Sequence, residues 1–213
     1  MLFRSVLVER EPHLGSASTG RNAGGVRHQF AAEANVRLSL ESIRAMERFR
    51  DEVGADLDFH QDGYLFLLST EASVGAFRAG VELQRRLGVE VDLLGPGDVA
   101  RLAPGVAVDG VRAATFCARD GIADPGGLTS GYAGAARRAG VEIALGVEAT
   151  AVRTDRERVV GVETTAGTVA TPAVVNAAGP WARIVGRMAG IDVPVEPLRR
   201  HIFIAREDRK SVV

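Results

Sequence analysis

Val6-Leu7-Val8-Glu9-Arg10 is a short apolar run that ends in an acid, and a glycine-rich stretch follows it from Gly15 to Gly25. In a dinucleotide-binding βαβ unit, such an acid ends the second strand and accepts hydrogen bonds from a ribose, about 20 residues after a G-x-G-x-x-G turn. Only eight residues precede Glu9. We therefore expect the chain to start inside a nucleotide-binding domain. The strand alone leaves a solvent-facing strand end open as the alternative reading of Glu9.

The composition is that of a globular protein with no strong electrostatic partner. The chain has 213 residues, of which 46% are apolar and 25% are charged, and its net charge is −1. That balance does not favour binding to nucleic acid or to an anionic membrane. No apolar run reaches the ~18 residues of a membrane span, and no signal-peptide pattern occurs at the N-terminus. We expect a cytoplasmic protein.

Several kinds of chemistry lack support in the sequence. The single cysteine, Cys117, excludes an intrachain disulfide and a cysteine zinc cage, and we expect it to be a small buried hydrophobe. His13, His28, His60 and His201 lack the spacing of metal ligands, and no Ser-His-Asp order with a nucleophile elbow occurs. We therefore expect neither a metal site nor a hydrolase.

The order of predicted elements is mixed. A strand at 5–9, a loop at 12–30 and a helix at 31–53 open the chain, and a middle section with more antiparallel character follows, before a β-α-β run returns. In the middle section, the hydrophobic periodicities and helix caps predict strands at 62–68, 89–94 and 111–116 and a helix from Thr70 to Leu87. After it they predict a helix from Asp124 to Gly140, one or two strands at 141–152 and a hairpin at 158–164 and 167–171. A strand at 173–177, a helix to Gly190 and a last strand at 200–205 end the order. This order predicts an α/β fold in which a doubly wound domain carries an inserted second domain.

The stretch from Gly15 to Val26 is the sharpest candidate site. Its small residues let backbone N–H groups approach a ligand, and the hydroxyls of Ser18 and Thr19 can bond phosphate oxygens. An ordinary flexible loop is the alternative, although Val26 and Phe30 supply apolar anchors that a linker would not need.

A second candidate site follows the apolar strand expected at 173–177. That strand leads into Ala178-Gly179-Pro180-Trp181. Small residues at this point let another backbone or a cofactor pass close by, while a structural turn is the alternative.

Taken together, these segments resemble the D-amino-acid oxidase-like family of FAD-dependent oxidoreductases, across nearly the whole chain. The sequence motif Arg-Asn-Ala-Gly-Gly-Val-Arg at 21–27 most resembles the sarcosine and dimethylglycine branch of that family. The family also includes glycine oxidase. The segment 120–125 resembles the part that leads back into the FAD domain, and 141–152 resembles the strand pair that touches adenine.

The resemblance implies a set of FAD-binding residues. These are Glu9, Arg10, Ser18, Thr19, Arg21, Asn22, Ala23, Gly24, Gly25, Val26, Ala149, Ala178, Gly179 and Trp181. The loop lacks the histidine that some relatives use to attach flavin covalently, so the resemblance implies noncovalent FAD.

The resemblance also implies a domain division and an activity. Residues 1–54 and 117–190 would form an incomplete Rossmann-like FAD-binding domain without its first strand and G-x-G-x-x-G turn. Residues 55–116 and 191–213 would form part of an inserted α+β substrate domain with a mixed or antiparallel sheet. The reaction would be oxidation of the C–N bond of an amino acid or N-methyl amino acid, such as sarcosine, glycine, dimethylglycine or a D-amino acid, to an imine. An arginine would hold the substrate carboxylate, with Arg27, Arg199 and Arg200 as candidates.

Two alternatives stay open at the level of sequence. The chain could be a flavin-free fragment or subunit that acts only in complex with a partner chain that completes the nucleotide fold, and a homo-oligomer also stays open. An NAD-dependent dehydrogenase is weaker, because the loop at 18–26 has no role in it.

Overall fold

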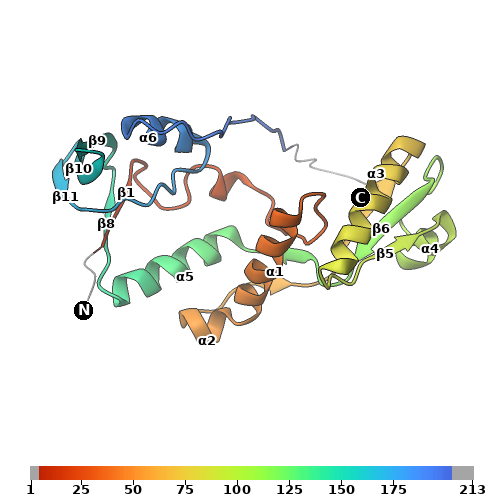
Figure 1. Ribbon diagram of the computed structural model, residues 1–213. Coiled ribbons are helices and arrows are strands. Elements are labelled where there is room, and N and C mark those ends of the chain that lie inside the picture. The colour runs from red at the N-terminus through yellow and green to blue at the C-terminus, as the bar shows by residue number, and fades with distance from the viewer. Residues whose placement is uncertain (1–4, 203–213) are drawn as a thin grey trace. The chain divides into compact units, whose positions relative to one another are not determined.

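The computed structural model describes residues 5–202, which form two compact units (Figure 1). Unit 1 comprises residues 5–22 and 129–202, and unit 2 comprises residues 23–128. Helix α5 (Pro125–Arg138) begins in unit 2 and ends in unit 1. The expected start of this helix is confirmed, because the Asp124 carboxylate accepts the N–H groups of Gly126 and Gly127 at 2.9 and 2.8 Å.

Unit 1 contains a parallel pair of strands. Strand β1 (Val6–Glu9) pairs with β8 (Glu142–Leu145), so that Val6 lies opposite Glu142 and Glu9 opposite Leu145 (Figure 1). The N–H of Val147 donates to the carbonyl of Glu9 at 3.0 Å and continues the pairing past the ends of both strands. The carboxyl end of β1 is thereby fixed beside the segment that follows β8.

An antiparallel meander forms the second sheet of unit 1. Its strands are β9 (Ala149–Asp155), β10 (Arg158–Thr164) and β11 (Gly167–Ala170), in the order β11-β10-β9. The hairpin expected at 158–171 is confirmed. Gly167 has a φ of +122°, a conformation that suits glycine at this tight turn.

The strand expected at 173–177 is not formed. The Asn176 side chain accepts the N–H of Ala178 at 3.3 Å and donates to the carbonyl of Ala182 at 2.8 Å, which turns the chain instead of extending it. A 3₁₀ turn, η2 (Gly179–Trp181), and the helix α6 (Ala182–Met188) follow. Of the strand expected at 200–205, residues 200–202 are not in a strand and 203–205 lie outside the described residues.

Two antiparallel sheets form the framework of unit 2. One has the order β2-β7-β3, and the other has the order β4-β6-β5. Their strands are β2 (Gly25–Val26), β3 (Phe59–His60), β4 (Tyr64–Leu68), β5 (Asp92–Leu94), β6 (Ala113–Cys117) and β7 (Gly121–Ala123). The turn between β6 and β7 joins the two sheets.

The helices of unit 2 follow the predicted periodicity with one correction. The helix expected at 31–53 is divided into α1 (Glu33–Glu47) and α2 (Phe49–Val53), because Arg48 leaves helical geometry at φ −104° and ψ 14°. Helix α3 (Glu71–Arg86) begins at the expected cap, where Thr70 and Ser73 form a capping box, and α4 (Pro96–Leu102) is short.

The core of unit 2 lies under helices α1 and α3. Val36, Val81, Val89, Val91 and Cys117 form one buried cluster, and the partly buried hydrophobic side chains that pack against it include that of Phe30. This contact anchors the segment between β2 and α1, which carries Arg27.

The fold is therefore a mixed α/β fold with parallel and antiparallel strands, as expected in class. Within residues 5–202, no helix combines the length and the apolar character that crossing a bilayer requires.

Candidate functional site

Three of the expected nucleotide-binding residues come together at the carboxyl end of β1. One oxygen of Glu9, Oε1, accepts the N–H of Glu11 at 2.9 Å, and the other, Oε2, has no hydrogen-bond partner within the described chain. The Arg10 guanidinium lies 4.1 Å from the centre of the Trp181 ring. The arrangement offers a free carboxylate oxygen beside a cation held on an aromatic face.

The first half of the glycine-rich loop belongs to unit 1. A close turn brings the N–H of Gly20 to 2.7 Å from the carbonyl of Gly15, and the 3₁₀ turn η1 (Thr19–Arg21) follows. In the structure as described, neither the hydroxyls of Ser18 and Thr19 nor the Arg21 guanidinium has a protein partner. The Asn22 amide donates to the carbonyl of Thr19 at 2.5 Å.

The second half of the loop, Ala23 to Val26, belongs to unit 2. Gly24 has a φ of +74°, and a side chain there would lie 2.4 Å from the carbonyl oxygen of Ala123. The backbones meet because the N–H of Ala123 donates to the carbonyl of Gly24 at 2.9 Å, next to the pairing of Gly25 with Ile122. Packing of β2 against β7 therefore accounts for Gly24 without any ligand.

The remaining expected nucleotide-binding residues lie in unit 1. Ala149 begins β9 opposite Thr164. Ala178 and Gly179 form the turn into η2, where Gly179 has a φ of +51°. This turn is the element that brings Trp181 to Arg10.

Arg27 lies among aromatic rings in unit 2. Its guanidinium carbon is 4.7 Å from the ring centre of Phe30, 5.4 Å from that of Phe66 and 6.0 Å from that of Tyr64. Tyr64 and Phe66 alternate along β4 and so present their rings on one face. The Arg27 Nε atom is buried and has no hydrogen-bond partner, and no carboxylate of the described residues forms an ion pair with Arg27. A cation in this environment is suited to an anion from outside the chain.

The other two arginine candidates are unlike Arg27. Arg199 and Arg200 are exposed and belong to unit 1, whereas Arg27 belongs to unit 2. The structure therefore does not bring the three candidates into one unit.

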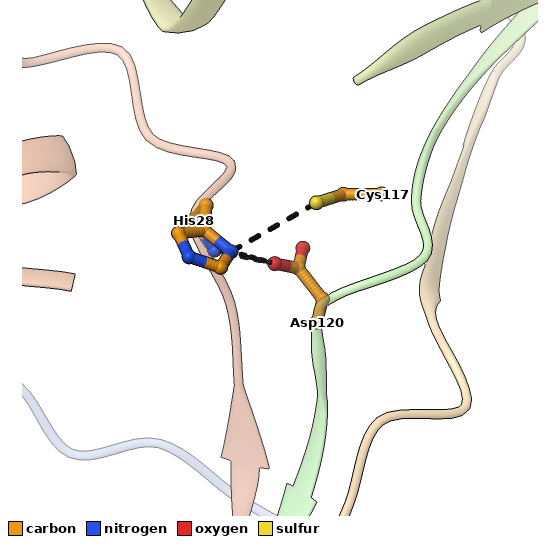
Figure 2. Close-up of side chains that lie close together, drawn as sticks. All are labelled: His28, Cys117 and Asp120. Atoms are coloured by element: carbon orange, nitrogen blue, oxygen red, sulfur yellow. Dashed lines mark hydrogen bonds and ion pairs between the residues drawn. The ribbon is translucent and has the colours of Figure 1, made fainter. Parts of the chain in front are cut away.

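A buried polar cluster lies directly beside Arg27 in the sequence. Asp120 has no exposed surface, and it accepts the His28 backbone N–H and pairs with His28 Nδ1, both at 2.7 Å through Oδ1 (Figure 2). Its other oxygen, Oδ2, accepts Gln29 Nε2 at 3.0 Å. Gln29 also donates to the carbonyl of Tyr64 at 2.8 Å and accepts from Thr115 Oγ1 at 2.6 Å. The cluster thus ties the segment after β2 to β4, β6 and the turn before β7.

Cys117 faces the same cluster. Its Sγ lies 3.8 Å from His28 Nδ1 (Figure 2). Burial, followed by the negative charge of Asp120, raises the pKa of the Cys117 thiol from 9.0 to about 12. His28, Cys117 and Asp120 place three potential metal-ligating atoms within 4.8 Å of one another. Hydrogen bonds already occupy both Asp120 oxygens, so the contacts within the chain account for the cluster without a metal ion.

Sequence reasoning missed this cluster. His28 and Asp120 are 92 positions apart, so no local spacing reveals their contact. The usable signal was the polar pair His28-Gln29 between the apolar anchors Val26 and Phe30, since buried polar groups require partners. The expected burial of Cys117 is confirmed, with 1% of its surface exposed.

Comparison with known proteins places the chain in one family. The model of the family described as FAD-dependent oxidoreductases matches residues 3–212. Sarcosine dehydrogenase, mitochondrial, of Homo sapiens is 34% identical over 209 residues, which cover 95% of this chain and 22% of that protein. The chain thus spans less than a quarter of the length of this relative.

Solved structures give the same result at the level of the fold. The L-proline dehydrogenase from P. horikoshii superposes with a TM-score of 0.78 at 29% identity, covering 90% of this chain and 57% of that one. The glycine oxidase from Geobacillus kaustophilus superposes with a TM-score of 0.77 at 27% identity, covering 91% of this chain and 54% of that one.

Proposed function

The chain belongs to the FAD-dependent oxidoreductase family, and on that premise we propose that it is part of an enzyme that oxidises the C–N bond of an amino acid or N-methyl amino acid. Sarcosine, glycine, dimethylglycine and proline-like or D-amino acids form the proposed substrate class. The names of the similar proteins support this class, since they include a sarcosine dehydrogenase, an L-proline dehydrogenase and a glycine oxidase.

The environment of Arg27 is the observation that carries the proposal. Every substrate in the class bears a carboxylate, and the planar guanidinium can bind a carboxylate through two parallel hydrogen bonds. Arg27 has a buried Nε without a partner and is flanked by aromatic rings that limit its hydration. Arg199 and Arg200 are secondary candidates for the same role.

The residues at the end of β1 suit the binding of noncovalent FAD. The free Oε2 of Glu9 can accept hydrogen bonds from a ribose diol, and the unpartnered hydroxyls of Ser18 and Thr19 can donate to phosphate oxygens. Arg21 adds an exposed positive charge. Bound FAD would supply the capacity to accept a hydride equivalent from the C–H bond beside the substrate nitrogen; this leaves an iminium ion, which gives the imine when the nitrogen has a proton to lose.

The domain division is part of the proposal. Residues 1–54 and 117–190 would form the Rossmann-like FAD-binding domain, and 55–116 with 191–213 would form part of the inserted substrate domain. The parallel pairing of β1 with β8 supports the first assignment, and the antiparallel sheet β4-β6-β5 supports the second. We keep the cytoplasm as the proposed location, although the human relative is named as mitochondrial.

Anaerobic mixing of the FAD-loaded protein with candidate substrates tests the proposal. We expect sarcosine, glycine or L-proline to remove the absorption band of oxidised flavin. Bound FAD that stays oxidised with every amino acid of the class would contradict the proposed reaction. The flavin should also be released on denaturation, since we propose noncovalent binding.

Unpaired apolar surface in unit 1 favours a second candidate function. Among residues 5–202, sheet β1-β8 has two strands and therefore two open edges; Val6 and Leu7 are each 42% exposed, and Val175 is 90% exposed. Open edges of this kind pair readily with another strand. The chain would then be a flavin-free subunit that a partner chain completes. A colourless, oligomeric protein that does not bind added FAD would favour this candidate.

A further inference from the structure

The segment that carries Arg27 has no regular secondary structure of its own. Residues 27–30 follow the two-residue strand β2 and precede α1, so no ladder or helix fixes the backbone there. A side chain that must present a charge in one position needs its backbone held. Side-chain hydrogen bonds from other parts of unit 2 supply that support.

Asp120 holds the peptide bond next to Arg27. The N–H that donates to Asp120 Oδ1 at 2.7 Å belongs to the peptide that joins Arg27 to His28. The His28 ring pairs with the same oxygen, and Gln29 donates to the other. Asp120 is in turn fixed by its backbone, because its carbonyl accepts the N–H of Gly63 at 2.9 Å.

Hydrogen bonds also hold two of the aromatic residues around Arg27. Gln29 donates to the carbonyl of Tyr64, whose ring flanks the guanidinium, and Gln84 Nε2 donates to the carbonyl of Phe30 at 3.0 Å. Phe30 supplies the ring nearest to the guanidinium. The Asp120 network therefore holds the backbone next to Arg27 and, through Gln29, the backbone of Tyr64, while Gln84 separately holds the backbone of Phe30.

The network also keeps Arg27 available for a ligand. Both carboxylate oxygens of Asp120 are occupied by His28 and Gln29, and Asp120 forms no ion pair with Arg27. A buried acid that is already satisfied does not compete for the guanidinium.

We propose that Asp120 is a positioning residue that holds Arg27 in place to bind the substrate carboxylate. This inference rests on the proposed role of Arg27. Asp120 does not touch the substrate, and its effect reaches the site through the Arg27–His28 peptide and through Gln29.

The variant Asp120→Asn tests the inference while keeping the size of the side chain. The amide replaces one acceptor by an NH₂ donor, so His28 and Gln29 cannot both be satisfied as in the parent chain. Asp124→Asn is the matched control, because Asp124 is also in unit 2 and accepts two N–H groups, but it caps α5 instead of bonding to His28 or Gln29.

The main readout is exchange of the Arg27 Nε proton with water, measured by NMR on the full chain without added FAD. Burial of Nε slows this exchange in the parent chain. We expect Asp120→Asn to accelerate it by roughly tenfold or more, as loss of a charge-assisted bond requires, and Asp124→Asn to leave it unchanged. Equal exchange in the parent chain and Asp120→Asn would overturn the inference.

Titration with acetate, a simple carboxylate, separates this inference from the proposed function. We expect acetate to shift the Arg27 Nε resonance in the parent chain and to bind roughly tenfold more weakly to Asp120→Asn. Equal acetate affinity in both would overturn the inference. Faster exchange in Asp120→Asn, with no acetate shift in the parent chain, would instead overturn the role proposed for Arg27 and leave the positioning intact.

A second variant keeps the inference testable if Asp120→Asn does not fold. Thr115→Val removes the hydroxyl that donates to Gln29 at 2.6 Å, with little change of size and no change to Asp120. We expect a smaller acceleration of Arg27 Nε exchange. No acceleration in a folded Thr115→Val chain would overturn the inference.

Discussion

Removal of the Asp120 carboxylate should destabilise unit 2 far more than removal of an exposed acid. Asp120→Ala takes the acceptor from the His28 N–H and His28 Nδ1, which are buried, and one of two acceptors from Gln29 Nε2. A buried polar group left without a partner costs about 1–3 kcal/mol, and the change removes the partner of two such groups on His28. We therefore expect a loss of about 2–6 kcal/mol in the free energy of unfolding.

Urea denaturation followed by far-UV circular dichroism measures this loss, and reaction of Cys117 with a thiol reagent reports the opening of unit 2. Cys117 belongs to the same buried cluster and is 1% exposed. Asp124→Ala is the control, because loss of a helix cap costs about 1 kcal/mol. If Asp120→Ala cost no more than Asp124→Ala, the buried network would not contribute the stability proposed for it.

Three further predictions concern the thiol, a glycine and the end of β1. The pKa of the Cys117 thiol is raised from 9.0 to about 12, so the folded state favours the neutral thiol. The contribution of this thiol to the free energy of unfolding is fully present below pH ~9 and is lost as the pH rises toward 12. Unfolding curves at pH 8 and pH 11 measure this loss. Gly24→Ala should lower the free energy of unfolding by about 2–4 kcal/mol, because the residue combines a positive φ with a contact of 2.4 Å between an added Cβ and the Ala123 carbonyl oxygen. Gly110→Ala is the control, since Gly110 has a φ of +78° but no neighbour within 4 Å. It should lower the same free energy by about 1 kcal/mol in the same urea assay. Glu9→Gln should weaken FAD binding roughly tenfold in a fluorescence titration, while Glu11→Gln should leave the affinity unchanged.

Local patterns in the sequence predicted the elements that are stabilised locally. Thr70 and Asp124 cap α3 and α5 as expected, because a cap uses only neighbouring backbone groups. The 173–177 segment shows the limit of this reasoning. An apolar run does not form a strand without a neighbouring strand, and Asn176 turns the chain there instead.

The candidate site shows the same division between local and distant contacts. The apolar anchor at Phe30 and the burial of Cys117 were expected from their residue types, and both are confirmed. The hydrogen bond from the His28 N–H to Asp120, which holds the backbone next to Arg27, joins residues more than 90 positions apart. Both residues lie outside helices and strands, so no periodic pattern in the sequence predicts their contact. The FAD-binding roles of Ser18 to Val26 stay predictions. For Gly24, the close packing on the Ala123 backbone explains why glycine occupies the position, and the sequence did not reveal this contact.

The ratio of reactivity toward sarcosine and dimethylamine tests whether Arg27 binds the carboxylate of the substrate. The two molecules share the N-methyl C–N bond, and only sarcosine bears the carboxylate that Arg27 would bind. Anaerobic flavin reduction should favour sarcosine by roughly a hundredfold or more in the parent protein, as expected for a charge-assisted pair, and Arg27→Gln should remove most of that preference. An unchanged preference in Arg27→Gln would contradict this role of Arg27.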